Sequence, residues 1–422
     1  MADVAPFRAL RYDPDQVELA RVLVPPYDVV AAHERASYWD RDPHNAIRLE
    51  LTRDAADESG TDYGDVAETL RSWRDSGVLV HDAAPAYWVL RQRFVSPLGE
   101  SLERTGFFGA LQLAGYDERV VLPHERTLRG PKADRLKLMR ASRANLSSIF
   151  LLYEDRKAVI AAALAAALEA GEAVTARDDA GVEHTLAPLR DAAAQESIRR
   201  FLGERSVVIA DGHHRYETAL AYRDERRADA HGRGPAPWDR TLAYFANAWA
   251  PGSLLLPIHR VVLKGPAPTE EAWRRGLPGW DSRRIELADP AKLPELLERE
   301  LAPLRDRHAF VADDGSGVVW LLSRPTDSEL SIRVVHREVL GDVFGLDDEA
   351  VREGAVAFPK SASEAARMVR AGEGAVALYL NPLTPDDVFR VTEAGEILPQ
   401  KSTFFFPKLP SGLVFRTLEP EA

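Results

Sequence analysis

The chain has 422 residues, with 54 Lys and Arg against 66 Asp and Glu and a formal net charge of −12. Its length exceeds what one hydrophobic core usually supports, so we expect more than one domain. The acidic balance disfavours a nucleic-acid binder, because affinity for a phosphate backbone comes from clustered cations. Since the chain has no cysteine, disulfides, thiolate nucleophiles and Cys-ligated zinc are excluded, and we expect a cytoplasmic protein.

No segment of the sequence predicts a membrane span. The start, MADVAPFRALRYDP, is too polar for a signal peptide, and the most apolar helix candidate, residues 158–170, is far shorter than the roughly 20 residues that a bilayer requires. We therefore expect a soluble protein without a membrane partner.

The first part of the chain predicts helices and hairpins joined by turns. In chain order these are a turn-rich segment at 22–30, an amphipathic helix near 65–76, a hairpin with strands at 87–95 and 103–111, a strand broken at Pro123, a charged loop at 122–136, an apolar run ending near 153, an Ala-rich helix at 158–170, a hairpin near 171–187, and a strand at 206–210 followed by a helix. Alternation of apolar residues, helical spacing and Pro or Gly at the turns support these assignments.

The second part mixes strands and helices without strict alternation. We expect an exposed loop at 224–240, a strand-like run at 254–263, a hairpin at 308–323, and helices that start at Ser361 and at Thr384 with Pro385. The composition of 264–273 predicts a domain boundary. We therefore expect an α+β protein with an N-terminal region at 1–265 and a C-terminal α/β domain at 266–422.

The stretch VVIADGHHRYETALAY, residues 207–222, is the strongest candidate site. A buried strand ends at Asp211-Gly212, and His213, His214 and Arg215 then occupy the first turn of a helix. Cations are misplaced there, because free backbone N–H groups and the positive end of the helix dipole already gather at that end. A bound anion would remove the conflict, so the pattern predicts a phosphate site without the usual nucleotide loops.

Two other interpretations of this stretch stay open. In the first, Asp211 caps the helix and forms a salt bridge with Arg215 while the histidines are solvated. In the second, His214 and Glu217, three residues apart on one helix face, ligate a metal.

The segment LPHERTLRGPKADRL, residues 122–136, is a second concentration of polar residues. Glu125 follows Pro123 and His124 in a turn, and Arg126, Arg129, Lys132 and Arg135 surround it. A carboxylate among cations is the composition expected where a general base acts beside a transferring phosphoryl group. The alternative is a solvated charged loop.

Two short runs add hydroxyl groups and a lysine. Residues 144–150 bring Ser147 and Ser148 before an apolar strand, and residues 399–413, PQKSTFFFPKLPSGL, bring Lys401, Ser402 and Thr403 before three phenylalanines. The second run, taken alone, is also typical of an edge strand.

These motifs carry a resemblance to a known superfamily. The run ADGHHRYETAL resembles the signature turn of the ParB/sulfiredoxin superfamily, in which a Gly-containing turn with His and Arg binds nucleotide phosphates. The Asp-Gly-His-His-Arg variant is similar to that of the free serine kinases of this superfamily, which phosphorylate L-serine. Three further runs match them: Pro123-His124-Glu125, the Ser-x-Ile-Phe run at 147–150, and Gly395-Glu396 with 399–403 and Pro407. Over its full length the chain resembles the DUF1015 family.

The resemblance implies a phosphotransferase that uses ATP or ADP with Mg²⁺ to phosphorylate a small hydroxyl compound, L-serine being the first candidate. Glu125 is then the base, assisted by His124. Asp211 contacts metal or substrate, and the nucleotide is bound by Gly212, His213, His214, Arg215, Ser147 and Ser148. Lys401, Ser402 and Thr403 contact the substrate as the C-terminal domain closes over the site.

The sequence departs from the kinases in two places. Phe404, Phe405 and Phe406 stand where those kinases continue with Arg and His, and the first hundred residues have no evident counterpart in them. Beside the phosphotransferase, a ParB-like nucleotide-binding regulator without kinase activity is therefore a second hypothesis. A metal-dependent hydrolase using His214, Glu217 and His124 is a third. Sulfiredoxin chemistry is excluded because it needs a cysteine.

Overall fold

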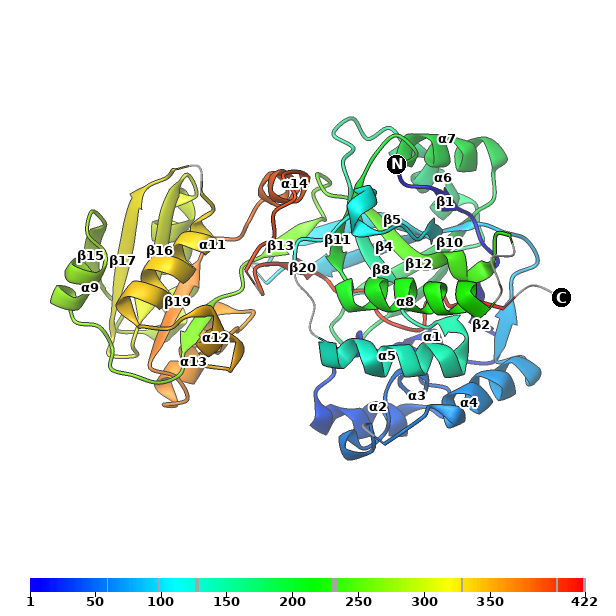
Figure 1. Ribbon diagram of the computed structural model, residues 1–422, viewed down its shortest axis with the longest axis horizontal. Coiled ribbons are helices and arrows are strands. Elements are labelled where there is room, and N and C mark those ends of the chain that lie inside the picture. Colours follow the sequence, from blue (N-terminus) through cyan, green and yellow to red (C-terminus); the bar gives the residue numbers. More distant parts are fainter. Residues whose placement is uncertain are drawn as a thin grey trace. The chain divides into compact units, whose positions relative to one another are not determined.

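The computed structural model describes residues 1–58, 60–97, 99–125, 129–229, 234–327, 329–399 and 401–419. The chain forms two compact units: unit 1 comprises Met1–Leu254 with Phe405–Ala422, and unit 2 comprises Leu255–Phe404 (Figure 1). The chain leaves unit 1 within β13 (Leu254–Leu256) and returns to it within β20 (Phe404–Phe406). Unit 2 is therefore an insertion near the C-terminal end of unit 1.

Unit 1 is built on a mixed sheet of parallel and antiparallel strands. Its strands lie in the order β6 (Val121–Leu122), β11 (Val207–Asp211), β8 (Ile149–Tyr153), β12 (Arg240–Asn247), β5 (Ser101–Gln112), β4 (Tyr87–Val95), β10 (Glu183–Leu189) and β9 (Val174–Arg177), and β1 (Val4–Ala5) also pairs with β5. β11 is parallel to β6 and antiparallel to β8, and β8 is parallel to β12.

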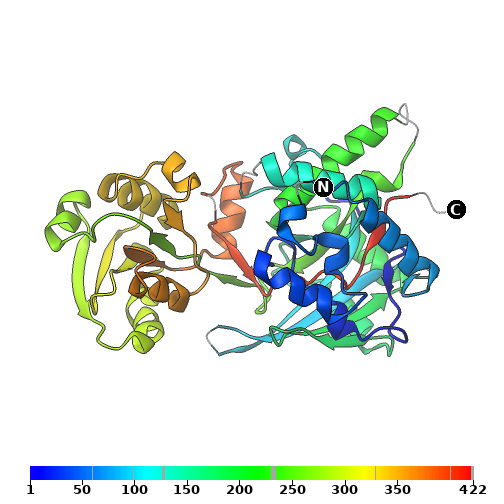
Figure 2. The same ribbon diagram turned by 90° about the horizontal axis from the view of Figure 1, so that it is seen from below.

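Helices cover this sheet and enclose its core. They are α1 (Leu19–Val22), α2 (Arg35–Arg41), α3 (Ile47–Glu50), α4 (Gly64–Asp75), α5 (Arg129–Ser142), α6 (Ala161–Glu169), α7 (Ala192–Leu202) and α8 (His213–Asp229). Apolar residues of α6, α7 and α8 pack on the central strands in one core cluster. A second cluster joins the N-terminal helices to α5 and to Phe415 of the C-terminal segment. Figure 2 shows these N-terminal helices in blue, in front of the rest of unit 1.

Two small sheets complete unit 1. β2 (Leu10–Tyr12) pairs with β3 (Leu79–His81), and β21 (Arg416–Thr417) pairs with β7 (Ala144–Asn145). The second pairing fixes the C-terminal segment on unit 1. The predicted division, 1–265 and 266–422, assigned this segment to the second domain; the structure differs because residues 405–419 pair and pack with unit 1.

Unit 2 is a six-stranded sheet with helices on both faces. The strand order is β15 (Asp281–Glu286), β17 (Val318–Pro325), β16 (Arg307–Asp313), β19 (Val376–Leu380), β14 (Arg260–Val262) and β18 (Val356–Ala357). The helices are α9 (Glu270–Gly276), α10 (Leu293–Leu296), α11 (Ser331–Val334), α12 (Asp348–Arg352), α13 (Ala362–Arg370) and α14 (Pro385–Glu393), with α10 and α11 continued by π-helical turns at Leu297–Leu301 and Val335–Val343. Two core clusters lie on the two faces.

The mixed architecture confirms the predicted α+β class, and the elements with clear periodicity formed as expected. In α4, Val66, Leu70 and Trp73 are buried as the helical spacing predicts. Thr384 caps α14 with the full capping box, and the Ser361 hydroxyl accepts from the Glu364 N–H at the start of α13. The ParB/sulfiredoxin-like core itself stays a prediction.

Two predicted loops are wrong. Residues 129–136 of the expected charged loop form the first part of α5, which continues to Leu138, buried in the second core cluster, while Lys132 and Arg135 form ion pairs. Residues 224–229 of the other loop continue α8, where Arg226 lies over the Trp238 ring at 5.0 Å and Arg227 pairs with Asp239 at 2.7 Å. Charged residues with good helix propensity gave no periodic apolar signal in either stretch.

Candidate functional site

The topology of unit 1 brings the predicted site segments to one edge of the sheet. β6 and β11 are parallel, with Val208 opposite Leu122, so the residues that follow both strands emerge at the same edge. β8 is antiparallel to β11, with Phe150 opposite Asp211, so the residues that precede β8 lie there too. The Pro-His-Glu turn, the 211–215 turn and Ser147-Ser148 therefore lie at the same edge. The sequence predicted that the first two also meet the 399–403 run; that run belongs to unit 2, and its convergence with them stays a prediction.

The turn between β11 and α8 requires glycine. Gly212 has φ +92°, a conformation that residues with a side chain rarely adopt, and a Cβ there would lie 3.0 Å from Nε of Arg215. α8 begins at His213, as predicted, and its first turn contains no acidic residue. The first N–H groups of the helix thus follow directly after a glycine without a side chain. This arrangement suits the close approach of an anion.

Asp211 lies between two cations. Its Oδ1 accepts from Nζ of Lys408 at 2.5 Å, and its Oδ2 accepts from the Arg215 guanidinium. Burial alone would raise the pKa of Asp211, but the charges of Lys408 and Arg215 outweigh it and hold the pKa well below its ordinary value. The carboxylate is therefore ionised, and Lys408 and Arg215 balance its negative charge.

Arg215 is engaged by the protein on two sides. Besides Asp211, its guanidinium donates to the backbone carbonyl of Ser148. The salt bridge between Asp211 and Arg215 belongs to the structural alternative considered above, although His213 is buried rather than solvated. Arg215 therefore joins α8 to the start of β8 and fixes the turn.

Two histidines pack against each other at this turn. The backbone N–H of His124 donates to Nε2 of His213 at 3.3 Å, and the rings meet edge to face with centroids 4.6 Å apart. Nδ1 of His124 lies 2.6 Å from the carbonyl of Ile209 and therefore carries the proton of the neutral ring. Burial lowers the pKa of both imidazoles, most strongly that of His213, so both are neutral at pH 7.

Glu125 lies next to this pair. Its Oε1 is 3.8 Å from Nε2 of His124, and its side chain is 22% exposed against 1% for His124. A carboxylate and an imidazole nitrogen that is an acceptor thus face each other at the border of solvent. This geometry suits the acceptance of a proton from a bound hydroxyl group.

A small cavity lies beside Arg215. It measures about 40 Å³ and is lined by Ser147, Glu50, Arg135 and Thr218 among others. The Thr218 hydroxyl is buried without a hydrogen-bond partner. The space suffices for a few water molecules.

The other cations of the 122–136 segment serve the fold. Lys132 pairs with Glu217 at 2.6 Å, and Arg135 is buried, donating to the Glu50 carbonyl and to Tyr63. Arg126 and the side chain of Arg129 lie outside the described residues, so their predicted places around Glu125 stay predictions. Lys132 and Arg135 are engaged by the fold.

The residues do not fit the predicted metal roles. Both oxygens of Asp211 accept from cations, and Glu217, a member of the alternative metal set, pairs with Lys132. Among the described residues no group of three or more His, Asp or Glu could hold a metal ion. Asp211 thus has the environment of an ion-pair partner rather than that of a Mg²⁺ ligand.

Lys401, Ser402 and Thr403 belong to unit 2. The Ser402 hydroxyl is buried and donates to the carbonyl of Pro399 at 2.6 Å. Lys401 is exposed and has φ +56°. Their predicted contact with substrate stays a prediction.

Sequence reasoning missed Lys408. It belongs to the run 399–413, but it follows the Lys-Ser-Thr motif and the three phenylalanines in sequence. The buried Arg104 guanidinium holds this segment by donating to the carbonyls of Phe406 and Pro407, and the Gln92 amide donates to that of Lys408. Phe405 packs on Phe150 and His124. A lysine between two prolines was the only local signal.

Fold and site together define an α+β protein with a cationic strand-to-helix turn beside a carboxylate. Residues 4–315 match the family model described as "Protein of unknown function (DUF1015)", and the chain belongs to this family. No curated protein matches the chain.

Three solved structures are similar to the chain, and the similarity to each covers 72% of this chain. One is a free serine kinase in complex with AMP (14% identity, 89% of that chain, TM-score 0.34). Another is a conserved hypothetical protein from Pyrococcus furiosus (14% identity, 93% of that chain, TM-score 0.34). The third is C-terminally truncated SbnI from Staphylococcus aureus (11% identity, 85% of that chain, TM-score 0.35).

Within the described part of the chain, none of the helices has both the length and the apolar character needed to cross a bilayer.

Proposed function

We propose that the chain is a nucleotide-dependent phosphotransferase that acts on a small hydroxyl compound, with free L-serine as the first candidate acceptor. One observation carries the proposal: Glu125, the two packed histidines and the start of α8, where Arg215 and Lys408 pair with Asp211, meet at one sheet edge. Phosphoryl transfer requires mainly a positioned phosphate and an oriented nucleophile, and this edge offers groups suited to both.

The proposed roles follow the geometry. The first N–H groups of α8 bind the phosphates with His213 and His214, and Gly212 allows their close approach. Arg215 and Lys408 hold Asp211, which fixes the turn. Ser147 and Ser148 lie at the same edge and are proposed as nucleotide contacts.

The base is proposed to be Glu125, with His124 as its neighbour. A hydroxyl group beside Glu125 would pass its proton to the carboxylate as its oxygen attacks the terminal phosphorus of ATP or ADP. The bond from that phosphorus to the bridging oxygen breaks, and ADP or AMP leaves with the bridging oxygen. Nε2 of His124 lies 3.8 Å from Oε1 of Glu125. Once Glu125 holds the proton, its carboxyl group would donate a hydrogen bond to this nitrogen.

Mg²⁺ in such reactions neutralises phosphate charge. Since Asp211 does not fit it, we assign the ion no ligand in this chain. The substrate contacts of Lys401, Ser402 and Thr403, and the closing of the C-terminal domain, remain part of the proposal. Small-angle scattering with and without nucleotide plus serine tests the closing, and equal radii of gyration would contradict it.

Calorimetric titration of ADP and ATP tests the phosphate site and the role of Glu125 together. We expect H213A to weaken nucleotide binding about tenfold and E125Q to bind as the wild type does, because Glu125 acts on the acceptor rather than on the phosphates. E125Q should also abolish turnover of L-serine. A ParB-like regulator would instead keep its function in E125Q, and unchanged affinity in H213A would contradict the phosphate site.

A further inference from the structure

Unit 2 contains a pocket at one end of its sheet. β16 begins at Arg307 and β14 at Arg260, while β17 ends at Pro325 and β19 at Leu380. Because β16 is antiparallel to β17 and β19, and β14 is antiparallel to β19, these four strand ends share one edge. The pocket at this edge has a volume of about 390 Å³, within the range of small-molecule sites.

Arginines from three separate segments line the pocket. Arg260 comes from β14, Arg305 and Arg307 precede and begin β16, and Arg390 comes from α14. Ile258 and Leu330 are among its apolar lining residues. The pocket thus combines guanidinium groups with an apolar wall.

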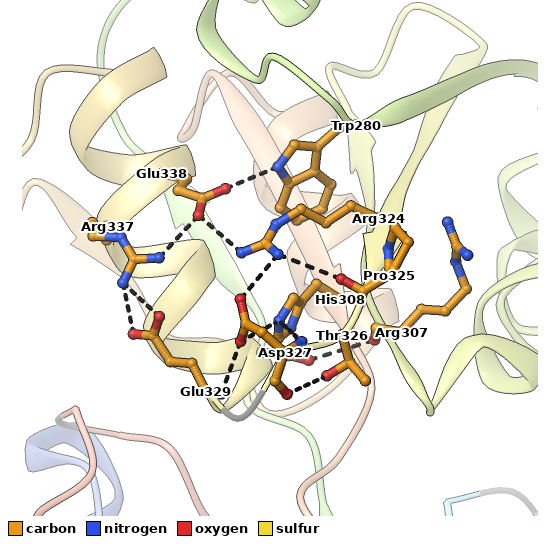
Figure 3. A network of polar contacts seen from close by, with 11 residues as sticks. Trp280, Arg307, His308, Arg324, Pro325, Thr326, Asp327, Glu329, Arg337 and Glu338 are labelled. Atoms are coloured by element: carbon orange, nitrogen blue, oxygen red, sulfur yellow. Dashed lines mark hydrogen bonds and ion pairs between the residues drawn. The ribbon is translucent and has the colours of Figure 1, made fainter.

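The acidic residues that line the pocket are neutralised by arginines. Asp327 accepts from Arg324 at 3.1 Å, and Glu329 pairs with Arg337 at 2.6 Å, as Figure 3 shows. Asp387 pairs with Arg390 at 3.3 Å, and its other oxygen accepts from the backbone N–H of residue 384 at the start of α14. These carboxylates therefore add little net negative charge to the pocket.

Neighbouring carboxylates compensate the charges of Arg305 and Arg307 less. Arg305 is exposed and makes no ion pair with the described residues. Arg307 pairs at 3.0 Å with Asp281, whose side chain is 84% exposed, and such surface pairs contribute little. The buried Arg260 guanidinium donates to the carbonyl of Ile258 and lies 3.2 Å from Nε2 of His336.

The wall that carries residues 325–327 and 329–331 is held in place. The buried His308 bridges it, with Nδ1 3.0 Å from the Ser331 hydroxyl and Nε2 3.1 Å from Oδ1 of Asp327 (Figure 3). Oδ1 of Asp327 also accepts from the N–H of Glu329 at 2.8 Å. A wall fixed in this way costs little ordering entropy when a ligand binds.

We propose that this pocket binds a small organic anion, whose oxyanion group contacts Arg305 and Arg307 and whose apolar part lies against Ile258 and Leu330. Carboxylate and phosphate ester share this chemistry, since guanidinium groups bind both. All lining residues belong to unit 2, and one of them, Ser402, is also a proposed substrate contact, whereas Glu125 and His213 belong to unit 1. The inference rests on Arg305 and Arg307, which have no role in the proposed function.

Calorimetric titration of the full chain with sodium malonate and, separately, with inorganic phosphate tests this proposal. We expect the wild type to bind at least one of them, and R305Q/R307Q to bind it about tenfold or more weakly. Arg284 on β15 is exposed and lies outside the pocket lining, so R284Q is the matched control and should bind as the wild type does. Binding of malonate alone would identify a carboxylate site, and binding of phosphate alone a phosphate site.

Three outcomes would overturn the proposal: no binding of either probe, equal affinity in R305Q/R307Q, or loss of binding in H213A but not in R305Q/R307Q. Thermal unfolding of each variant reports whether it folds. The single variant R305Q changes only an exposed side chain, so it should fold and still weaken binding.

Discussion

At the scale of single residues, the ion pairs of Asp211 govern the shape of the candidate site. This buried carboxylate links Arg215 of α8 to Lys408 of the C-terminal segment. Two cations on one carboxylate leave a net positive charge beside the first turn of α8. The sequence showed Asp211 and Arg215 as neighbours, but it could not show Lys408, because nearly two hundred residues separate the partners.

Removing the Lys408 charge should weaken both the fold and the site. K408M leaves Asp211 with one cation and should lower the free energy of unfolding by about 2 kcal/mol, because a buried carboxylate loses a charged hydrogen bond. Urea unfolding measures this. K157M, at an exposed lysine of the same unit, is the control and should unfold as the wild type does. Equal stability of K408M and K157M would show that the pair contributes nothing.

At the scale of elements, the site depends on where strands end. The motifs around His124 and Asp211 were recognisable because each follows an apolar strand, and the sheet then placed them together. The glycine turn before α8 could be predicted locally, since Gly212 and the start of α8 are neighbours in sequence, and its binding of phosphate stays a proposal. The loop predicted at 122–136 was wrong from residue 129 on, because the buried face of α5 is formed by contacts distant in sequence.

The glycine turn makes a specific prediction. G212A should weaken nucleotide binding, because an added methyl group meets Arg215 in a backbone conformation already unfavourable for alanine. Gly171 has φ +84° and open space around it, so G171A carries a similar backbone cost without the clash and is the matched control. We expect both to lose about 1 kcal/mol of unfolding free energy, and only G212A to lose nucleotide affinity. Similar nucleotide affinities in the two variants would contradict a site at this turn.

At the scale of the whole molecule, the insertion of unit 2 was not predictable. Its boundaries fall inside β13 and β20, and composition predicted a boundary at 264–273 instead. Local patterns show where strands begin and end. They do not show that the C-terminal segment returns to unit 1, where β21 pairs with β7. The run 401–403 therefore lies in a different unit from Lys408, although a few residues separate them.

Buried histidines should make the stability of the molecule depend on pH. Burial lowers the pKa of His124 and His213 in unit 1, and it lowers those of His259 and His336 in unit 2 to about 3 each. Below the ordinary histidine value of about 6.5, the unfolded chain binds protons that the folded chain does not, so stability falls as pH falls and is constant above that value.

Denaturant unfolding between pH 7.5 and pH 5 measures this effect. Each such histidine contributes a slope of up to about 1.4 kcal/mol per pH unit. H213N should flatten the dependence for unit 1, and H33N, at an exposed histidine, should not. A pH-independent midpoint in the wild type would show that these imidazoles are not neutral in the folded state.

The proposed phosphotransfer is tested most directly by ³¹P NMR of the purified protein with Mg²⁺, L-serine and either ATP or ADP. We predict a phosphomonoester signal that matches O-phosphoserine, appears with one of the two donors, and is absent in E125Q. No new phosphomonoester with either donor would contradict serine as the acceptor. A signal of equal rate in E125Q would contradict the assignment of Glu125 as the base.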